Sequence, residues 1–100
     1  MEFIYEHPLK EYMYKKGKNI IVVEEITSNN SDFEITELHL QLIDEKLADY
    51  FKTKKGYYTV KTQTGEVLLP PYRLKIGETV TLGLKSFLGI KYITQKGIQH

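Results

Sequence analysis

Hydrophobic and polar positions alternate along much of the chain with a period of two, which is typical of β-strands. In the segment 33–43, Leu38, Leu40 and Leu42 alternate with polar residues, and a similar alternation runs through 79–85. Successive side chains of a strand point to opposite faces of a sheet. Each segment is therefore expected to have one buried and one solvent-facing side.

The clearest strand is predicted over 19–27. Ile20 and Val22 lie on one face of this segment, and Ile21 and Val23 lie on the other. A strand that is apolar on both faces is typical of the interior of a sheet. We therefore expect a central strand that is covered on both sides.

Shorter strands are expected over 2–5, 11–14, 57–63 and 66–69. Pro8 separates the first two, because proline lacks the N–H that a strand donates to its neighbour. The N-terminal segment, residues 1–14, is therefore predicted to be an edge or an arm.

Turn residues punctuate the rest of the chain. Clusters of Gly, Asn, Ser and Asp favour turns, and they predict turns at 28–32, 64–65 and 76–78. A last strand is expected through 88–92, with a bulge at Gly89. The polar tail that follows, residues 95–100, is expected to fray.

Phe33 and Ile35 are out of phase with the leucines that follow them. A bulge or kink near Thr36 would reconcile the two halves of this strand.

A short helix is predicted near 44–52. Asp44 is a good residue for the N-terminal cap of a helix. Leu47, Tyr50 and Phe51 have the spacing of three and four residues that places side chains on one helix face. A helix this short needs support, so we expect this side to pack on a sheet.

The strands and turns together predict an all-β fold in one domain, residues 1–100. Two segments resemble parts of immunoglobulin-like domains: 20–40, IIVVEEITSNNSDFEITELHL, and 69–84, LPPYRLKIGETVTLGL. The resemblance implies an antiparallel β-sandwich, and a small β-barrel is the alternative. The chain departs from antibody domains in having neither their cysteine pair nor their tryptophan.

Composition narrows the chemistry. The chain has no cysteine, which excludes disulfides, thiol nucleophiles and cysteine zinc sites. Its formal net charge is only +1, and its bases are lysines except for Arg73. Arginine is the residue that reads guanine and phosphate with two hydrogen bonds, so its scarcity disfavours a sequence-specific nucleic-acid reader. The abundance of Lys, Ile, Asn and Tyr suits an AT-rich genome, such as that of a low-GC bacterium, an archaeon or a virus.

The sequence shows no signal for secretion or membrane insertion. No basic start followed by an apolar run is present at the N-terminus. The longest purely apolar run is 20–23, far short of a membrane span. We expect a cytoplasmic protein with no membrane partner. A location in a virion is also compatible with the sequence.

We find no catalytic residue, metal site or cofactor site in the sequence. His7, His39 and His100 lack the spacing of metal ligands, and Glu37 beside His39 on one strand face provides too few ligands for zinc. No phosphate-binding glycine loop precedes a helix. The protein is therefore predicted not to be an enzyme and to have no small-molecule substrate.

Aromatic residues are concentrated in the N-terminal arm. Phe3, Tyr5, Tyr12 and Tyr14 exceed what two short edge strands need. Tyrosine is enriched in protein interfaces, and an exposed edge can accept a strand from another chain. These residues are candidates for binding a protein partner or a second copy, unless the arm pairs with its own sheet.

A second candidate surface combines cations with an aromatic residue. Lys52, Lys54, Lys55 and Tyr57 have the composition of surfaces that bind single-stranded nucleic acid. The alternative is a solvated loop whose tyrosine enters the core.

These patterns favour a non-enzymatic module for protein–protein interaction or for structure and assembly. We expect it to have no cofactor, and its composition is compatible with an origin in a virus or a mobile element. A small barrel that binds nucleic acid through 52–58 is the alternative.

Overall fold

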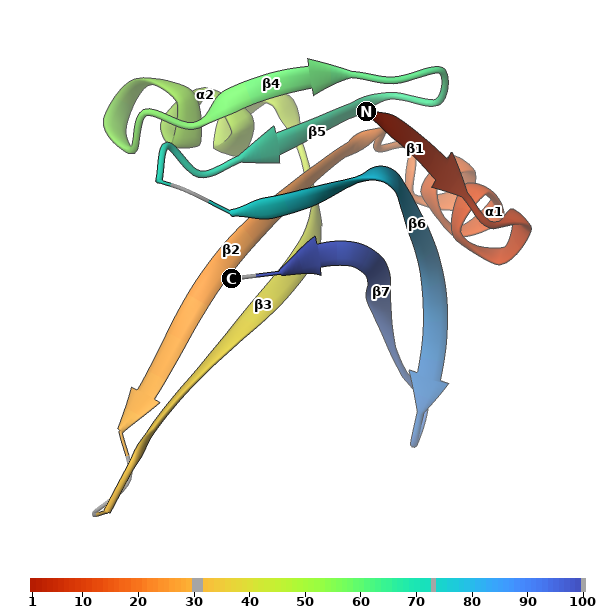
Figure 1. Ribbon diagram of the computed structural model, residues 1–100. Helices are drawn as coiled ribbons and strands as arrows, with labels where there is room; N and C mark the ends of the chain where they lie inside the picture. The colour runs from red at the N-terminus through yellow and green to blue at the C-terminus, as the bar shows by residue number, and fades with distance from the viewer. Residues whose placement is uncertain (30–31, 73, 100) are drawn as a thin grey trace.

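The computed structural model describes residues 1–29, 32–72 and 74–99, and within them the chain forms seven strands and two helices (Figure 1). In chain order these are β1 (Glu2–Tyr5), α1 (His7–Lys16), β2 (Ile20–Asn29), β3 (Glu34–Ile43), α2 (Glu45–Lys54), β4 (Tyr58–Lys61), β5 (Glu66–Leu69), β6 (Lys75–Phe87) and β7 (Ile90–Gln99). One sheet has the strand order β1-β6-β7, and the other has the order β3-β2-β5-β4. This mainly β arrangement of two sheets, compatible with a small β-sandwich, confirms the predicted fold class.

The strand directions differ in part from the antiparallel sandwich expected from the sequence. Three ladders are antiparallel, but β1 pairs with β6 and β2 pairs with β5 in parallel. Side chains alternate with the same period in parallel and antiparallel strands, so the pattern carries no information on direction. The prediction of a central strand over 19–27 is confirmed, because β2 lies between β3 and β5.

The N-terminal segment contains a helix that the sequence analysis missed. The strand predicted over 11–14 is wrong, since these residues belong to α1. Pro8 lies in the first turn of the helix, where its missing N–H costs no hydrogen bond. Leu9 and Met13, four residues apart, are both buried, and Gly17 ends the helix in the left-handed conformation at φ 66°.

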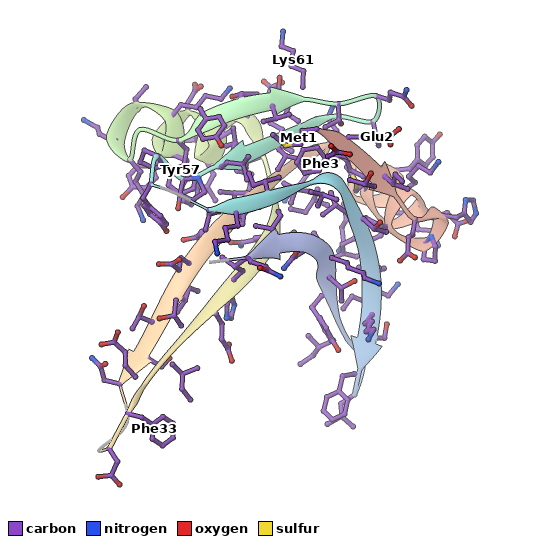
Figure 2. All side chains as sticks on the ribbon, in the orientation of Figure 1. Met1, Glu2, Phe3, Phe33, Tyr57 and Lys61 are labelled. Atoms are coloured by element: carbon purple, nitrogen blue, oxygen red, sulfur yellow. The ribbon has the colours of Figure 1, made fainter. Side chains whose placement is uncertain are left out.

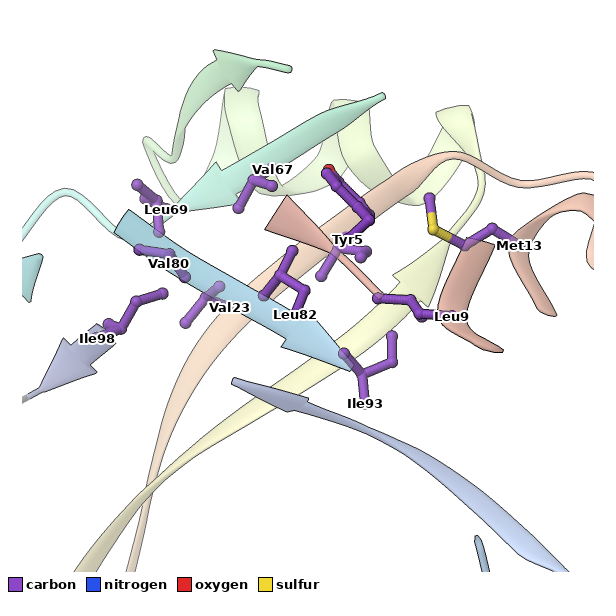
Figure 3. Close-up of a cluster of buried hydrophobic side chains, with 11 residues drawn as sticks. Tyr5, Leu9, Met13, Val23, Val67, Leu69, Val80, Leu82, Ile93 and Ile98 are labelled. Carbon is purple, nitrogen blue, oxygen red and sulfur yellow. The ribbon is translucent and has the colours of Figure 1, made fainter. Parts of the chain in front are cut away.

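Two hydrophobic clusters lie on the two faces of β2. Ile21 and Val23 face a cluster formed by both sheets and α1 (Figure 3), and Ile20 and Val22 face a second cluster beneath α2. The first cluster, which we call the inter-sheet cluster, consists of Tyr5, Leu9, Met13, Ile21, Val23, Val67, Leu69, Val80, Leu82, Ile93 and Ile98. The apolar start of β2 is therefore covered on both sides, as its sequence predicts.

The second helix is found close to its predicted position. The side chain of Asp44 accepts a hydrogen bond of 2.9 Å from the backbone N–H of Leu47, which caps the helix. Ala48 and Phe51 are buried, whereas Leu47 and Tyr50 are exposed, which corrects the predicted packing side. Neither of the two helices in the described residues is long and apolar enough to cross a membrane.

The hairpin predicted around Thr64 and Gly65 is confirmed, since β4 and β5 pair there in antiparallel orientation. The turn predicted over 76–78 is wrong, because β6 runs through these residues. The ladder between β6 and β7 is irregular between Ile76 and Thr81, and this accommodates the local glycine without ending the strand.

The C-terminal strand is longer than predicted. Leu88 and Gly89 form a turn with φ angles of 50° and 81°, and not a bulge within a strand. The tail expected to fray belongs to β7 through Gln99, and residue 100 lies outside the described residues. The side chain of Gln95 bonds to both the N–H and the C=O of Ile98, whose side chain is buried.

Two hairpins project from the core and diverge from one another, β2–β3 and β6–β7 (Figure 1). The register of β2–β3 is regular along its whole length, so no bulge occurs near Thr36. Ile35 therefore stays out of phase with the leucines and faces away from the inter-sheet cluster. Part of the turn predicted over 28–32 lies outside the described residues.

Candidate functional site

The end of the β6–β7 hairpin exposes an apolar surface. Phe87 pairs with Ile90 as the last rung of the ladder, and these side chains are 67% and 71% exposed. Lys85 and Tyr92 form the neighbouring pair on the same face. Leu88, in the turn, is 86% exposed. We call these five residues the basic tip.

The alternation of the two strands creates this surface. Leu84 pairs with Ile93, and both pack toward the inter-sheet cluster. Side chains at the next positions on each strand must point the opposite way. Lys85, Phe87, Ile90 and Tyr92 therefore face away from the core.

The turn residue Leu88 has an unusual conformation. Its φ of 50° makes it the one non-glycine residue with positive φ among the described residues. Two-residue hairpin turns of this kind favour Asn, Asp or Gly, and the left-handed conformation costs an L-residue about 1–2 kcal/mol. The sequence thus places a large apolar side chain at the end of the hairpin, where a small polar residue would fit the backbone better.

The second hairpin has a related surface of opposite charge. Ile26 and Ile35 are diagonal neighbours on the face of β2–β3 that points away from the inter-sheet cluster, and they are 41% and 39% exposed. Glu24 and Glu37 lie on the same face. Phe33, at the end of the hairpin, is 58% exposed (Figure 2). We call these five residues the acidic arm.

The charges of the two hairpins are segregated along the chain. The segment 19–45 contains seven acidic residues and neither lysine nor arginine. The segment 79–99 contains three lysines and no acidic residue. The chain is therefore almost neutral overall, at +1, although its two hairpins carry opposite charges.

The N-terminal aromatic residues do not form one surface. Phe3 is half-buried, and Tyr5 is a core residue whose hydroxyl shares a 3.0 Å hydrogen bond with Thr62. Burial raises the pKa of Tyr5, and the hydrogen bond with Thr62 offsets part of this effect. Tyr5 is therefore part of the core and presents little surface to a partner. Tyr12 is partly buried, and Tyr14 is 89% exposed.

Two lysines lie over the ring of Tyr12. The Nζ atoms of Lys16 and Lys91 are 5.6 Å and 5.5 Å from its ring centroid. Cations at this distance are attracted to the face of an aromatic ring. Tyr12 thus links α1 to β7, and the predicted arm is in fact a packed part of the fold.

The lysines predicted to bind nucleic acid lie at the end of α2 and beyond it. Lys52 Nζ is 3.8 Å from a carboxylate oxygen of Glu66, and Lys55 Nζ is 5.4 Å from the ring centroid of Phe51. Lys54 is exposed. The ring of Tyr57 is partly buried and packs at a tilt on Phe51, with 5.0 Å between their centroids.

Tyr57 also belongs to a polar cluster where β2 leaves the core. Burial raises the pKa of Tyr57 to about 12, and Tyr72, Glu24 and Glu25 add to this effect. Burial likewise raises the pKa of Tyr72, while hydrogen bonds with the Glu25 backbone and with Tyr57 act in the opposite direction. The two tyrosines keep their protons at neutral pH and tie the chain around 57 and 72 to β2.

The described residues contain no group of three side chains suited to holding a metal ion. They also contain no buried side-chain nitrogen or oxygen without a hydrogen bond. Comparisons with protein-family models, curated proteins and solved structures find no match to this chain.

The sequence analysis missed both exposed hairpin ends. The signal lies in the run 87–90, Phe-Leu-Gly-Ile, because three large apolar residues surround a turn where polar residues are usual. The alternation assigns Leu88 and Ile90 to a strand over 88–92, and Phe33 to a strand over 33–43. Periodicity does not say whether another element covers the end of a strand.

Proposed function

We propose that the protein is a non-enzymatic module for protein–protein association and that the basic tip is its contact surface. The observation that carries this proposal is the exposure of Phe87, Leu88 and Ile90 at the end of a projecting hairpin. Contiguous exposed apolar surface on a small folded domain is typical of an interaction site. Apolar and aromatic side chains surrounded by charges also have the composition of an interface centre with a polar rim.

The backbone at Leu88 supports the same proposal. A residue in a disfavoured conformation persists when it contributes something that a relaxed residue would not. Leu88 contributes apolar area at the turn of the hairpin, where it is 86% exposed.

The nucleic-acid alternative has less support. Lys52 and Lys55 lie against Glu66 and Phe51, and the Tyr57 ring is packed. A single-strand platform requires open aromatic faces beside cations. The lysines near 52–55 are better explained by favourable charge at the C-terminal end of α2.

Site-specific photo-crosslinking tests the proposal. A photoreactive phenylalanine analogue is placed at Leu88 in the full chain, and the matched control carries it at Tyr14, which is equally exposed on α1. We expect protein adducts from position 88 in the cell and few or none from position 14. The 88 adduct should weaken when Lys85→Glu is added and persist when Lys75→Glu, at the base of the same hairpin, is added. Equal adducts from both positions, or none from 88, would contradict the proposal.

A further inference from the structure

We propose that the partner of the basic tip is the acidic arm of a second copy of this chain, so that the protein associates with itself head to tail. This inference rests on the proposed function and identifies its partner. The argument uses the charge, the apolar composition and the placement of the two hairpins.

Charge favours this pairing over the others that two copies offer. The basic tip contributes Lys85 on its contact face, and the acidic arm contributes Glu24 and Glu37 on its own, where Glu37 Oε2 also lies 3.2 Å from His39 Nε2. Opposite potentials attract across an interface and guide its formation, whereas like charges placed together are costly. A tip against a tip would bring lysines together, and an arm against an arm would bring carboxylates together. Only the mixed pairing satisfies both surfaces.

The apolar residues of the two surfaces also correspond in number and size. The tip exposes Phe87, Leu88 and Ile90, and the arm exposes Ile26, Phe33 and Ile35. On each surface the apolar residues are adjacent, and charged side chains flank them. This arrangement allows an apolar centre to be buried while the charges pair at its rim.

One molecule cannot bring its own two surfaces together. The ends of β2–β3 and β6–β7 diverge from the core, and Phe33 lies at one end far from the other hairpin (Figures 1 and 2). The contact must therefore join two chains. Because the contact uses two different surfaces, one molecule of a pair still has a free arm and the other a free tip. Further molecules can bind these surfaces, which produces a closed ring or an extended filament.

A complementation experiment tests head-to-tail association. The tip variant is Leu88→Asp, which adds an acidic group where the arm is acidic and suits the left-handed backbone. The arm variant is Ile35→Lys, which adds a cation where the tip is basic. Both positions are exposed, so both variants should fold, and circular dichroism and thermal melting verify this. Tyr14→Asp and Thr27→Lys are matched controls; Thr27 faces the opposite side of β2 from Ile26.

Sedimentation velocity of the full chain gives the readout. We expect the unmodified protein to grow in mass with concentration and to dissociate as salt is raised, since screening weakens the charge pairing. Each variant alone should lose at least tenfold in association affinity, and both controls should retain it. An equimolar mixture of the two variants should associate more tightly than either variant alone, because the mixture contains one intact tip and one intact arm per pair.

Charge exchange provides a second readout that is independent of the apolar residues. Lys85→Glu and Glu37→Lys should each weaken association, and a chain carrying both should recover it. A protein that stays monomeric up to about 1 mM, where even weak contacts are populated, would overturn the inference. So would association that both variants retain, or variants that fail to complement. The proposed function would survive any of these results if position 88 crosslinks to a different protein in the cell.

Discussion

Phe87 and Ile90 face each other across the last rung of the β6–β7 ladder, and both remain largely exposed among the residues that the structure describes. Leu84 and Ile93 form the pair three rungs closer to the core. Their side chains lie on the opposite face and pack into the inter-sheet cluster. The same hairpin thus uses one face for folding and the other for contact. Substitutions on the two faces should separate stability from association.

The first prediction concerns this separation. Leu82 is fully buried in the inter-sheet cluster, and Leu82→Ala should lower the free energy of unfolding by about 2–5 kcal/mol through lost burial and an unfilled cavity. Leu88→Ala should change it by less than about 0.5 kcal/mol, because Leu88 is exposed. Urea unfolding of dilute protein, followed by circular dichroism, measures both. Comparable losses would show that Leu88 packs against something in the folded chain.

The second prediction concerns the N-terminal segment. The sequence analysis predicts an edge or an arm for residues 1–14, but Tyr5, Leu9 and Met13 are part of the inter-sheet cluster. Deleting this segment removes three buried side chains and the strand that pairs with β6. We therefore expect the truncated chain to lose cooperative thermal unfolding and near-ultraviolet circular dichroism. A truncated chain that melts in one sharp transition near the full-length temperature would contradict this packing.

The error in the N-terminal segment has a physical explanation. Tyr12, Met13 and Tyr14 alternate in a way that suits a strand, and Pro8 suits a break between two strands. The helical spacing of Leu9 and Met13, with Pro8 in the first turn and Gly17 just past the end, was also present in the sequence. Periods of two and of 3.6 residues are poorly separated in a segment this short.

For the other elements, the success of the prediction depended on how far apart in sequence the contacting residues lie. The start of β2 was predicted correctly because its apolar faces are local information. The parallel pairing of β2 with β5 and the burial of Ile98 depend on segments that are distant in sequence. The two candidate surfaces were missed for the same reason. The end of a hairpin is exposed when no segment distant in sequence packs on it, and the local pattern does not show this.

The third prediction concerns Gly97 in β7. Its φ of 120° is disfavoured for other residues, and an added Cβ would lie 2.5 Å from the carbonyl oxygen of Thr79. The Cα of Gly97, which would carry this Cβ, and the carbonyl group of Thr79 both belong to the backbone of the β6–β7 ladder, so neither can move freely. Gly97→Ala should lower the free energy of unfolding by about 1–3 kcal/mol. Gly89→Asn is the matched control, because nothing lies within 4 Å of its Cβ position and Asn tolerates positive φ. Thermal unfolding should show a larger loss for the first variant than for the second.

The last prediction concerns alkaline pH and the tyrosine cluster. Folding raises the pKa of Tyr57 from 10.0 to about 12, chiefly through burial. Below pH 10 the tyrosine holds its proton in both the folded and the unfolded chain, so it makes no difference to the pH dependence of stability. Between about pH 10 and pH 12 the unfolded chain releases the proton while the folded chain retains it. Because the folded state then binds more protons than the unfolded state, stability must fall as the pH rises through this window.

Tyr57→Phe tests this linkage directly, because phenylalanine has no proton to lose. Its stability should fall less steeply between pH 10 and pH 12 than that of the unmodified chain, although loss of the hydrogen bond to Tyr72 lowers stability at neutral pH. Tyr14→Phe is the control, since it removes an exposed hydroxyl and leaves the cluster and every lysine in place. Urea midpoints measured at intervals from pH 8 to about pH 12 give the three slopes. Equal slopes for Tyr57→Phe and the unmodified chain would show that Tyr57 ionises as easily in the folded protein as in the unfolded chain. The tyrosine would then be solvated, and the packing of the segment around 57 on Phe51 and β2 would be incorrect.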